Sequence, residues 1–219
     1  GTSPAMRLVT VNNSPGQQSD PHVSGDLVVY TDQALHAQIR YYNFASGIDA
    51  AISNVLGNGA IALDFLPDVS GSRVVFTRLA DGYARIMVFD TATSKLSEVD
   101  PVAAPQRLGV AIGGNTVAYI DVASGGDVVA WDLATSTRKV VSNSAAFEVN
   151  PNVSPDGRVI VWESCVSSIS NCDVFQAVLT AGNWVVSAVA NSPEREANPD
   201  TNGRLVVYDA DRSGSRTGQ

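Results

Sequence analysis

The stretch NPNVSPDGRVIVW, residues Asn150–Trp162, decides the fold because looser copies of it return four more times along the chain. Each copy has a proline or another turn-entry residue, a β-branched residue, a Ser/Gly turn and a short apolar run that ends in an aromatic residue. The other copies are DPHVSGDLVVY (Asp20–Tyr30), LPDVSGSRVVF (Leu66–Phe76), VAIGGNTVAY (Val110–Tyr119) and NPDTNGRLVVY (Asn198–Tyr208). The closing aromatic residues are 46, 43, 43 and 46 residues apart.

A period of this size with strand-like content is typical of a β-propeller, in which each repeat is one small sheet, or blade. A second run follows each aromatic residue after a polar connector, as in IMVFDTATS (Ile86–Ser94), and a third run such as RKVVS follows that. Period-two alternation and Gly/Asn punctuation favour strands in all of them. The sequence therefore predicts an all-β, five-bladed β-propeller of four-stranded antiparallel blades, with strands a to d running outward from a central channel.

The two chain ends complement each other. MRLVTVNNS (Met6–Ser14) parallels WVVSAVANS (Trp184–Ser192), so residues 6–13 are expected to be a strand d that closes the last blade. One domain over 1–219 follows, with repeats near 15–53, 54–100, 101–142, 143–190 and 191–219. The last blade lacks its strand c within this chain; a longer parent protein, strand exchange with another chain, or trimming of the sequence would each account for this.

The phrase NPNVSPDGRVIVW and its copies resemble the TolB-like family of WD-like propeller repeats, and the resemblance covers nearly the whole chain. Only the fourth repeat has the full Ser-Pro-Asp-Gly turn, at Ser154–Gly157, and the third lacks the proline. The resemblance implies a disc with a central channel, used in the bacterial envelope or outside the cell to bind proteins, glycans or peptides. Some members of the family hold metal ions, and others form part of peptidases or carry lyase sites.

The composition agrees with a periplasmic or extracellular protein. The net charge is −8 with only 14 Lys and Arg residues, and no cluster of cations suited to phosphates occurs, so nucleic acid is not an expected partner. No apolar run approaches the roughly 20 residues of a membrane span. The acidity is compatible with divalent cations or cationic peptides, but plain solubility is the favoured interpretation.

The two cysteines flank one connector. Cys165 and Cys172 stand at the ends of a predicted hairpin in the fourth repeat, where strand ends are close enough for disulfide geometry. A disulfide is the prediction, and two free thiols in a reducing compartment are the alternative. Zinc is disfavoured, because His22 and His36 are the only histidines and are not spaced as ligands.

Catalytic motifs are missing from the sequence: it has no Gly-x-Ser-x-Gly elbow, phosphate loop or His-Glu-x-x-His helix. His22 is expected in strand a of the first repeat and His36 in an exposed connector. Glu194 and Glu196 stand in the last d-to-a connector, where a solvated charge run is favoured over action on a sugar. No catalytic residue is predicted.

Two sets of residues could hold a cation, with calcium as the candidate. The segment Asp209-Ala-Asp211-Arg-Ser-Gly214 resembles the first half of a calcium loop, although it lacks the distal glutamate. The second set is positional, because equivalent residues of the five a strands should form a ring around the channel: His22, Asp68, Ala111, Asn152 and Asp200. Asp68, Asn152 and Asp200 would supply oxygen ligands, although a water-filled polar channel is the favoured interpretation, since a channel needs a polar lining in any case.

Three classes of function remain. The leading hypothesis is a non-catalytic binding or scaffold module that presents loops to a protein or glycan. The second is a structural module of a cell-surface protein, and the third is the propeller domain of a larger enzyme such as a carbohydrate lyase or a peptidase.

Overall fold

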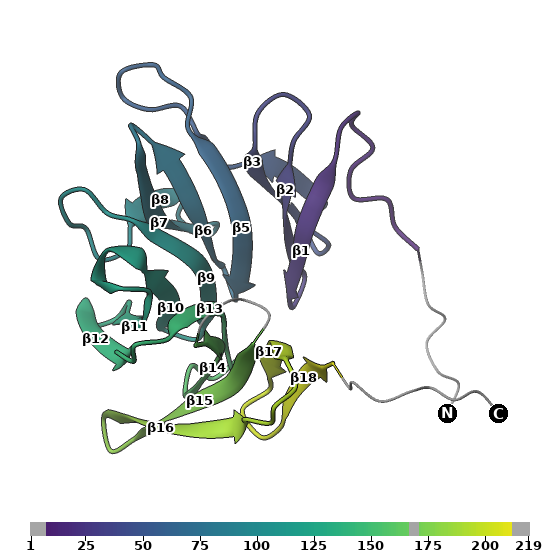
Figure 1. Cartoon of the computed structure of the whole chain (residues 1–219). Coiled ribbons are helices and arrows are strands. Elements are labelled where there is room, and N and C mark those ends of the chain that lie inside the picture. Colours follow the sequence, from purple (N-terminus) through teal and green to yellow (C-terminus); the bar gives the residue numbers. More distant parts are fainter. Residues whose placement is uncertain (1–7, 167–170, 212–219) are drawn as a thin grey trace, which may run out of the picture.

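In the computed structural model, which describes residues 8–166 and 171–211, the chain consists of eighteen β-strands and one three-residue 3-10 helix, Val122–Ser124. The strands form five antiparallel sheets that follow one another around a central axis (Figure 1). The all-β, antiparallel prediction is therefore confirmed.

The first four sheets have four strands each, paired in the order of the sequence. Sheet 1 contains β1 (Gln18–Ser24), β2 (Leu27–Asp32), β3 (Gln38–Asn43) and β4 (Ile48–Ala51). Sheet 2 contains β5 (Leu63–Ser70), β6 (Arg73–Ala80), β7 (Tyr83–Asp90) and β8 (Lys95–Glu98). Sheet 3 contains β9 (Arg107–Gly113), β10 (Thr116–Asp121), β11 (Asp127–Asp132) and β12 (Thr137–Ser142). Sheet 4 contains β13 (Phe147–Val153), β14 (Val159–Cys165), β15 (Cys172–Thr180) and β16 (Asn183–Ala190). Sheet 5 contains β17 (Glu196–Thr201) and β18 (Val206–Ala210).

The strand a of each sheet lies innermost, and successive a strands are neighbours: β1 contacts β5, β5 contacts β9, β9 contacts β13 and β13 contacts β17. The repeated aromatic residue falls in every case on strand b, which the sequence pattern predicted. The repeat therefore places equivalent positions of five strands around one axis.

The hydrophobic core lies between neighbouring sheets, and the b strands β6 and β10 contribute to it with both faces. Phe76 packs with Val29 and Ile39 of sheet 1, while the preceding residue, Val75, packs with Tyr119 of sheet 3. Because side chains alternate along a strand, one apolar run serves two interfaces. This is why the repeats read as continuous apolar runs and not as alternating ones.

The ends of the chain differ from the expected arrangement. Residues 8–17 belong to no strand, Met6 and Arg7 lie outside the described residues, and the described part of sheet 5 has two strands. Closure of the last blade by residues 6–13 therefore stays a prediction. None of the described residues form a helix that is long and apolar enough to cross a membrane.

Candidate functional site: the axial cavity

The a strands enclose two adjoining cavities on the axis, with volumes of about 490 Å³ and 470 Å³. Four of the five residues predicted to form a ring line both cavities: His22, Asp68, Asn152 and Asp200. Ala111, the fifth, lines the first cavity only. The structure thus brings together the side chains that the repeat predicted, at the boundary between the two cavities.

The first cavity is acidic. Asp20 joins Asp68 and Asp200 in its lining, and His22 is the basic group among them. Proline residues stand between these side chains, and their locked φ angles make the wall rigid: Pro67, Pro151 and Pro199. A cationic or hydrogen-bond-donating group fits this lining better than an anion does.

Asp68 holds two neighbouring sheets together from within the ring. Its Oδ1 lies 3.0 Å from Nδ1 of His22 in sheet 1 and accepts a hydrogen bond from its neighbour Val69. Its Oδ2 accepts a hydrogen bond of 2.7 Å from the backbone N–H of Ile112 in sheet 3. The hydrogen bond to Asp68 raises the pKa of His22 above its ordinary value of 6.5. Asp68 is therefore a structural contact as well as a candidate ligand.

The second cavity is lined by polar residues and, in about equal number, by apolar side chains from all five sheets: Val23, Val69, Ile112, Val153, Leu205 and Val207. Polar groups, among them Ser70 and Thr201, stand between them. The first cavity is the more acidic end of the channel, because Asp20 lines it alone while both cavities share Asp68 and Asp200.

A second ring was missed by the sequence interpretation. Each a strand has a β-bulge just before the ring position, and the bulged residue has a positive φ of 51–56° in every sheet. These residues are Asp20, Leu66, Gly109, Asn150 and Asn198, and all of them line the first cavity. Asp, Asn and Gly adopt this conformation readily, whereas Leu66 adopts it against the preference of its residue type. The recurring Asp-Pro and Asn-Pro pairs were the available signal.

The second calcium candidate is only partly described. Asp209 Oδ2 accepts a hydrogen bond of 2.9 Å from the side-chain amide of Asn198, and the backbone N–H of Asp211 donates to the carbonyl of Arg195. The rest of the loop, including Gly214, lies outside the described residues. Asp209 and Asp211 are both exposed.

Glu196 is not part of a solvated charge run, and that expectation was wrong. It begins β17 and is 2% exposed, and its Oε1 accepts hydrogen bonds from the hydroxyl and the backbone N–H of Ser192. Burial, and next the negative charge of Glu196, raise the pKa of Asp173 in β15. Glu194 is half-buried, and His36 lies exposed between β2 and β3 as expected.

The predicted disulfide is confirmed. Cys165 and Cys172 face each other on β14 and β15 and are joined by a disulfide. Glu163 lies close enough to both sulfur atoms to form, with them, the one compact group of potential metal ligands among the described His, Cys, Asp and Glu residues. Since both sulfur atoms are in the disulfide, this group is not a metal site.

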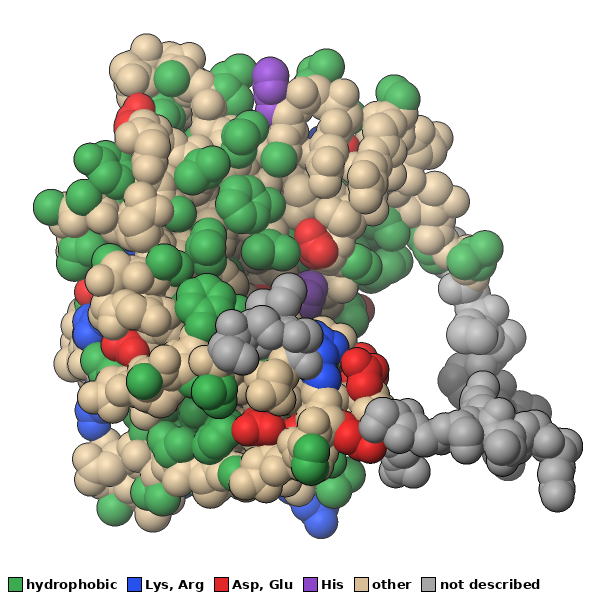
Figure 2. Space-filling view, viewed as in Figure 1, with side chains coloured by type: hydrophobic (Ala, Val, Ile, Leu, Met, Phe, Trp, Pro, Cys, Tyr) green, Lys and Arg blue, Asp and Glu red, His purple; other side chains and the backbone are tan. Residues whose placement is uncertain are grey.

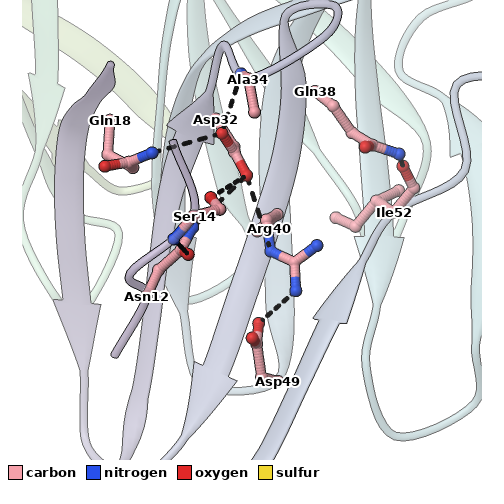
Figure 3. A network of polar contacts seen from close by, with 9 residues as sticks. All are labelled: Asn12, Ser14, Gln18, Asp32, Ala34, Gln38, Arg40, Asp49 and Ile52. Carbon is pink, nitrogen blue, oxygen red and sulfur yellow. Dashed lines mark hydrogen bonds and ion pairs between the residues drawn. The ribbon is translucent and has the colours of Figure 1, made fainter. Parts of the chain in front are cut away.

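A polar network fixes the segment that precedes β1 (Figure 3). The carboxylate of Asp32 accepts hydrogen bonds from the side chains of Asn12, Ser14 and Gln18. Arg40 extends the network to Asp49, at 2.8 Å. Residues 12–14 are thereby held against the C-terminal end of β2.

No protein-family model and no curated protein matches the chain, whereas many solved structures do. TolB from Acinetobacter baumannii is 18% identical with a TM-score of 0.63, over 93% of this chain and 51% of that one. A TolB candidate from Agrobacterium tumefaciens is 13% identical with a TM-score of 0.69, over 94% and 74%. A prolyl endopeptidase matches at 16% identity and a TM-score of 0.63, over 84% of this chain and 31% of its own.

The chain spans about half the length of the Acinetobacter protein. Puromycin hydrolase also matches, over 91% of this chain and 36% of its own, at 16% identity and a TM-score of 0.66. At identities of 13–18% these likenesses concern the fold alone. The chain has a TolB-like β-propeller fold.

Proposed function

We propose that this chain is a non-catalytic binding module that receives part of a protein ligand at the acidic end of its axial cavity. The lining of that cavity carries the proposal. It combines the carboxylates of Asp20, Asp68 and Asp200 with amide side chains and rigid prolines, and it contains no Ser, Thr, Cys or Lys nucleophile. Such a lining favours recognition of a cationic side chain over nucleophilic catalysis. A glycan is the other ligand class that polar amides and carboxylates suit.

An array of peptides with and without Lys or Arg, probed beside a glycan array, tests this proposal. We expect binding to basic peptides, weakened about tenfold or more in the double variant Asp20→Asn/Asp200→Asn, because both carboxylates face the cavity. Asn tolerates the positive φ of Asp20, so the fold should not change.

Asp26→Asn is the matched control, because Asp26 is an exposed turn residue outside both axial cavities. It removes one negative charge, where the double variant removes two, and it should leave peptide binding unchanged. If the double variant binds basic peptides as well as the wild type does, or if only glycans bind, the proposed ligand is wrong.

We propose a periplasmic or extracellular location for the module. The disulfide supports it, since disulfides persist in oxidising compartments. Fractionation of the native cells, followed by alkylation and intact-mass measurement, checks both points. A cytoplasmic protein with two alkylatable thiols would contradict them.

A propeller domain within a larger enzyme is the second candidate. Its support is the likeness to prolyl endopeptidase and puromycin hydrolase, of which this chain covers about a third. The coding sequence on both sides of this chain is the discriminating observation. An adjoining hydrolase or lyase domain would favour this candidate over a free-standing binding module.

We further propose that the five sheets are the blades of a ring that residues 6–13 close at sheet 5. The parallel between Met6–Ser14 and Trp184–Ser192 supports it, as does the attachment of Asn12 and Ser14 to Asp32. Deletion of residues 1–13 should lower the melting temperature of the whole chain, because a ring loses more than an open array when one end is removed. An unchanged melting temperature would rule out closure.

A further inference from the structure

Leu66 occupies a position that suits a leucine poorly in two respects. It is the residue of the β-bulge in β5 and has a φ of 53°, a conformation that bulky side chains adopt only at a cost in energy. Its side chain lines the first axial cavity and is nevertheless 41% exposed. The bulge residues of the other a strands are Asp20, Gly109, Asn150 and Asn198. An apolar, strained and exposed side chain at this position is therefore particular to sheet 2.

The asparagines at the same position make contacts within the fold that a leucine cannot make. Asn150 donates a hydrogen bond of 2.6 Å to the carboxylate of Glu163, and Asn198 donates one of 2.9 Å to that of Asp209. Backbone strain is common where a ligand-binding surface uses the strained side chain. Leu66 makes no such hydrogen bond and stands at the cavity, so its strain and exposure point to a role in binding.

Leu66 belongs to a larger exposed apolar surface on sheet 2. Leu63 of β5 pairs with Leu79 of β6, and in the connector between sheets 1 and 2 Val55 pairs with Ile61. These four side chains are 40–60% exposed. Hydrophobic side chains gather over β5 and β6 on the face shown in Figure 2. We call the following residues the apolar rim: Val55, Ile61, Leu63, Leu66 and Leu79.

A buried ion pair holds the apolar rim in place. Asp64 of β5 is fully buried and accepts hydrogen bonds of 2.8 Å and 2.7 Å from Arg78 of β6. Arg78 also donates one of 2.8 Å to the carbonyl of Ser53, at the start of the connector. The side-chain amide of Asn54 donates one of 2.9 Å to the carbonyl of Ala62, at its end. A surface that is fixed before binding loses little conformational entropy when a ligand covers it.

We propose that the apolar rim binds an apolar side chain that stands close to a basic residue in the sequence of the partner protein. The inference rests on the proposed function, because the basic residue enters the acidic cavity. Asp20, Asp68 and Asp200 line that cavity, and none of the described residues in its lining is Lys or Arg. Leu66 is the member of the rim that also lines the cavity. A segment whose basic side chain enters the cavity therefore has its neighbouring residues at the rim.

The spacing within β5 sets the spacing within the ligand. Leu63 and Leu66 are three residues apart, which is about 10 Å along a strand. An extended ligand has the same rise per residue, so its apolar residue lies about one to three positions from the basic one. A glycan has no comparable aliphatic side chain. The rim thus favours a polypeptide in which basic and apolar residues lie close together.

Two labelled peptides test the inference on the full chain. The first is a Gly/Ser peptide with one central arginine, and the second has a leucine two positions before that arginine and another two positions after it. Fluorescence anisotropy should show that the leucine peptide binds about tenfold more tightly, because it covers apolar surface in addition to the carboxylates. If both peptides bind equally well, the inference is wrong and the proposed function is unaffected. If neither binds, both are wrong.

Leu66→Asn separates a role in binding from a role in the fold. Asn adopts a positive φ readily, so the relieved strain should offset the lost burial and the melting temperature should not fall. The affinity for the leucine peptide should fall about fivefold, and that for the arginine-only peptide should not change. Leu66→Met is the matched control, because it keeps an apolar side chain, and it should bind both peptides as the wild type does. A lower melting temperature with equal losses for both peptides would overturn the inference.

The connector provides a second test, away from the cavity. Val55→Thr/Ile61→Thr keeps the β-branched shape of both side chains and makes the surface polar, so it should weaken binding of the leucine peptide about threefold. Val185→Thr is the matched control, since Val185 is 55% exposed on β16, and it should have no effect. Equal effects of these variants would overturn the inference. A stable dimer of the free protein that Leu66→Asn abolishes in size-exclusion chromatography would also overturn it, because a second copy would then cover the rim.

Discussion

Sheets 4 and 5 carry the same repeat, yet one is a complete part of the core and the other is half exposed. NPNVSPDGRVIVW ends in Trp162, which is 1% exposed, and NPDTNGRLVVY ends in Tyr208, which is 41% exposed. Strand b of sheet 4, β14, packs against sheet 3 with one face and pairs with β15 along its outer edge. Among the described strands, β18 pairs with β17 only. The apolar run makes both strands suitable for burial, but only the strand that has neighbouring sheets and strands around it is buried.

The largest expected difference between the two sheets is the cost of removing the repeated aromatic residue. Trp162→Ala should destabilise the chain by about 3–5 kcal/mol, because it leaves a cavity between sheets 3 and 4. Tyr208→Ala should cost less than about 1 kcal/mol, as is usual for partly exposed positions. Urea unfolding of both variants measures this. Equal costs would mean that sheet 5 is as well covered as sheet 4.

The second effect concerns Glu163, the side chain that ties the two sheets together. It is fully buried on β14, and its Oε1 accepts hydrogen bonds from the side chain of Asn150 and the backbone N–H of Asn198 in sheet 5. Glu163→Ala should cost about 2–3 kcal/mol, because it leaves both donors without this acceptor. Faster hydrogen exchange in β17 than in β13 should accompany it.

Glu163→Gln is the matched control for that variant. It keeps an acceptor oxygen and nearly the same volume, so it should cost about half as much or less. If β17 exchanges no faster in Glu163→Ala than in the wild type, sheet 5 is held by its other contacts and the carboxylate is not the tie.

The sequence predicted the strands, their order and the axial ring, because those depend on a repeated local pattern. It predicted neither the bulges at Asp20 and its four counterparts nor the burial of Glu196. A bulge depends on backbone conformation at one residue, and the prolines of the Asx-Pro pairs were interpreted only as turn-entry residues. Glu196 was interpreted as solvated because the serine that satisfies it, Ser192, is not identifiable as its partner until β16 and β17 are placed.

The disulfide supplies the next smaller effect and is confined to sheet 4. Cys165 and Cys172 are seven residues apart, and in the chain-entropy treatment a loop of that size contributes about 2 kcal/mol. Reduction, or the double variant with Ser at both positions, should lower the free energy of unfolding by that amount. The exchange of β18 should not change, since both cysteines belong to sheet 4. A larger loss that also affects β18 would show that the hairpin holds the two sheets together.

A carboxyl pair makes the junction of sheets 4 and 5 sensitive to pH. The pKa of Asp173 is raised by burial and by Glu196, so ionising Asp173 disfavours the folded state. This penalty is absent at low pH, develops as pH rises from the ordinary value of 3.8 through the raised pKa, and is complete above it. Asp173→Asn should therefore raise the melting temperature at pH 7, with a gain that shrinks toward pH 4. The exposed-turn variant Asp26→Asn should show no such trend.

The smallest expected effect is calcium binding at the ring, where sheet 4 contributes an amide and sheet 5 a carboxylate. Asn152 and Asp200 each use Oδ1 to accept the N–H of the next residue, and Asp68 uses both oxygens on backbone donors. Asp68 has little acceptor capacity left, and only Asp200 and Asn152 offer free lone pairs, so we expect a dissociation constant no tighter than about 10⁻⁴–10⁻³ M. Calorimetric titration of chelator-treated protein measures it, with Asp68→Ala/Asp200→Ala beside Asp209→Ala/Asp211→Ala. Loss of heat in the first variant alone assigns calcium to the ring, loss in the second alone assigns it to the end of β18, and no heat in the wild type contradicts both sites.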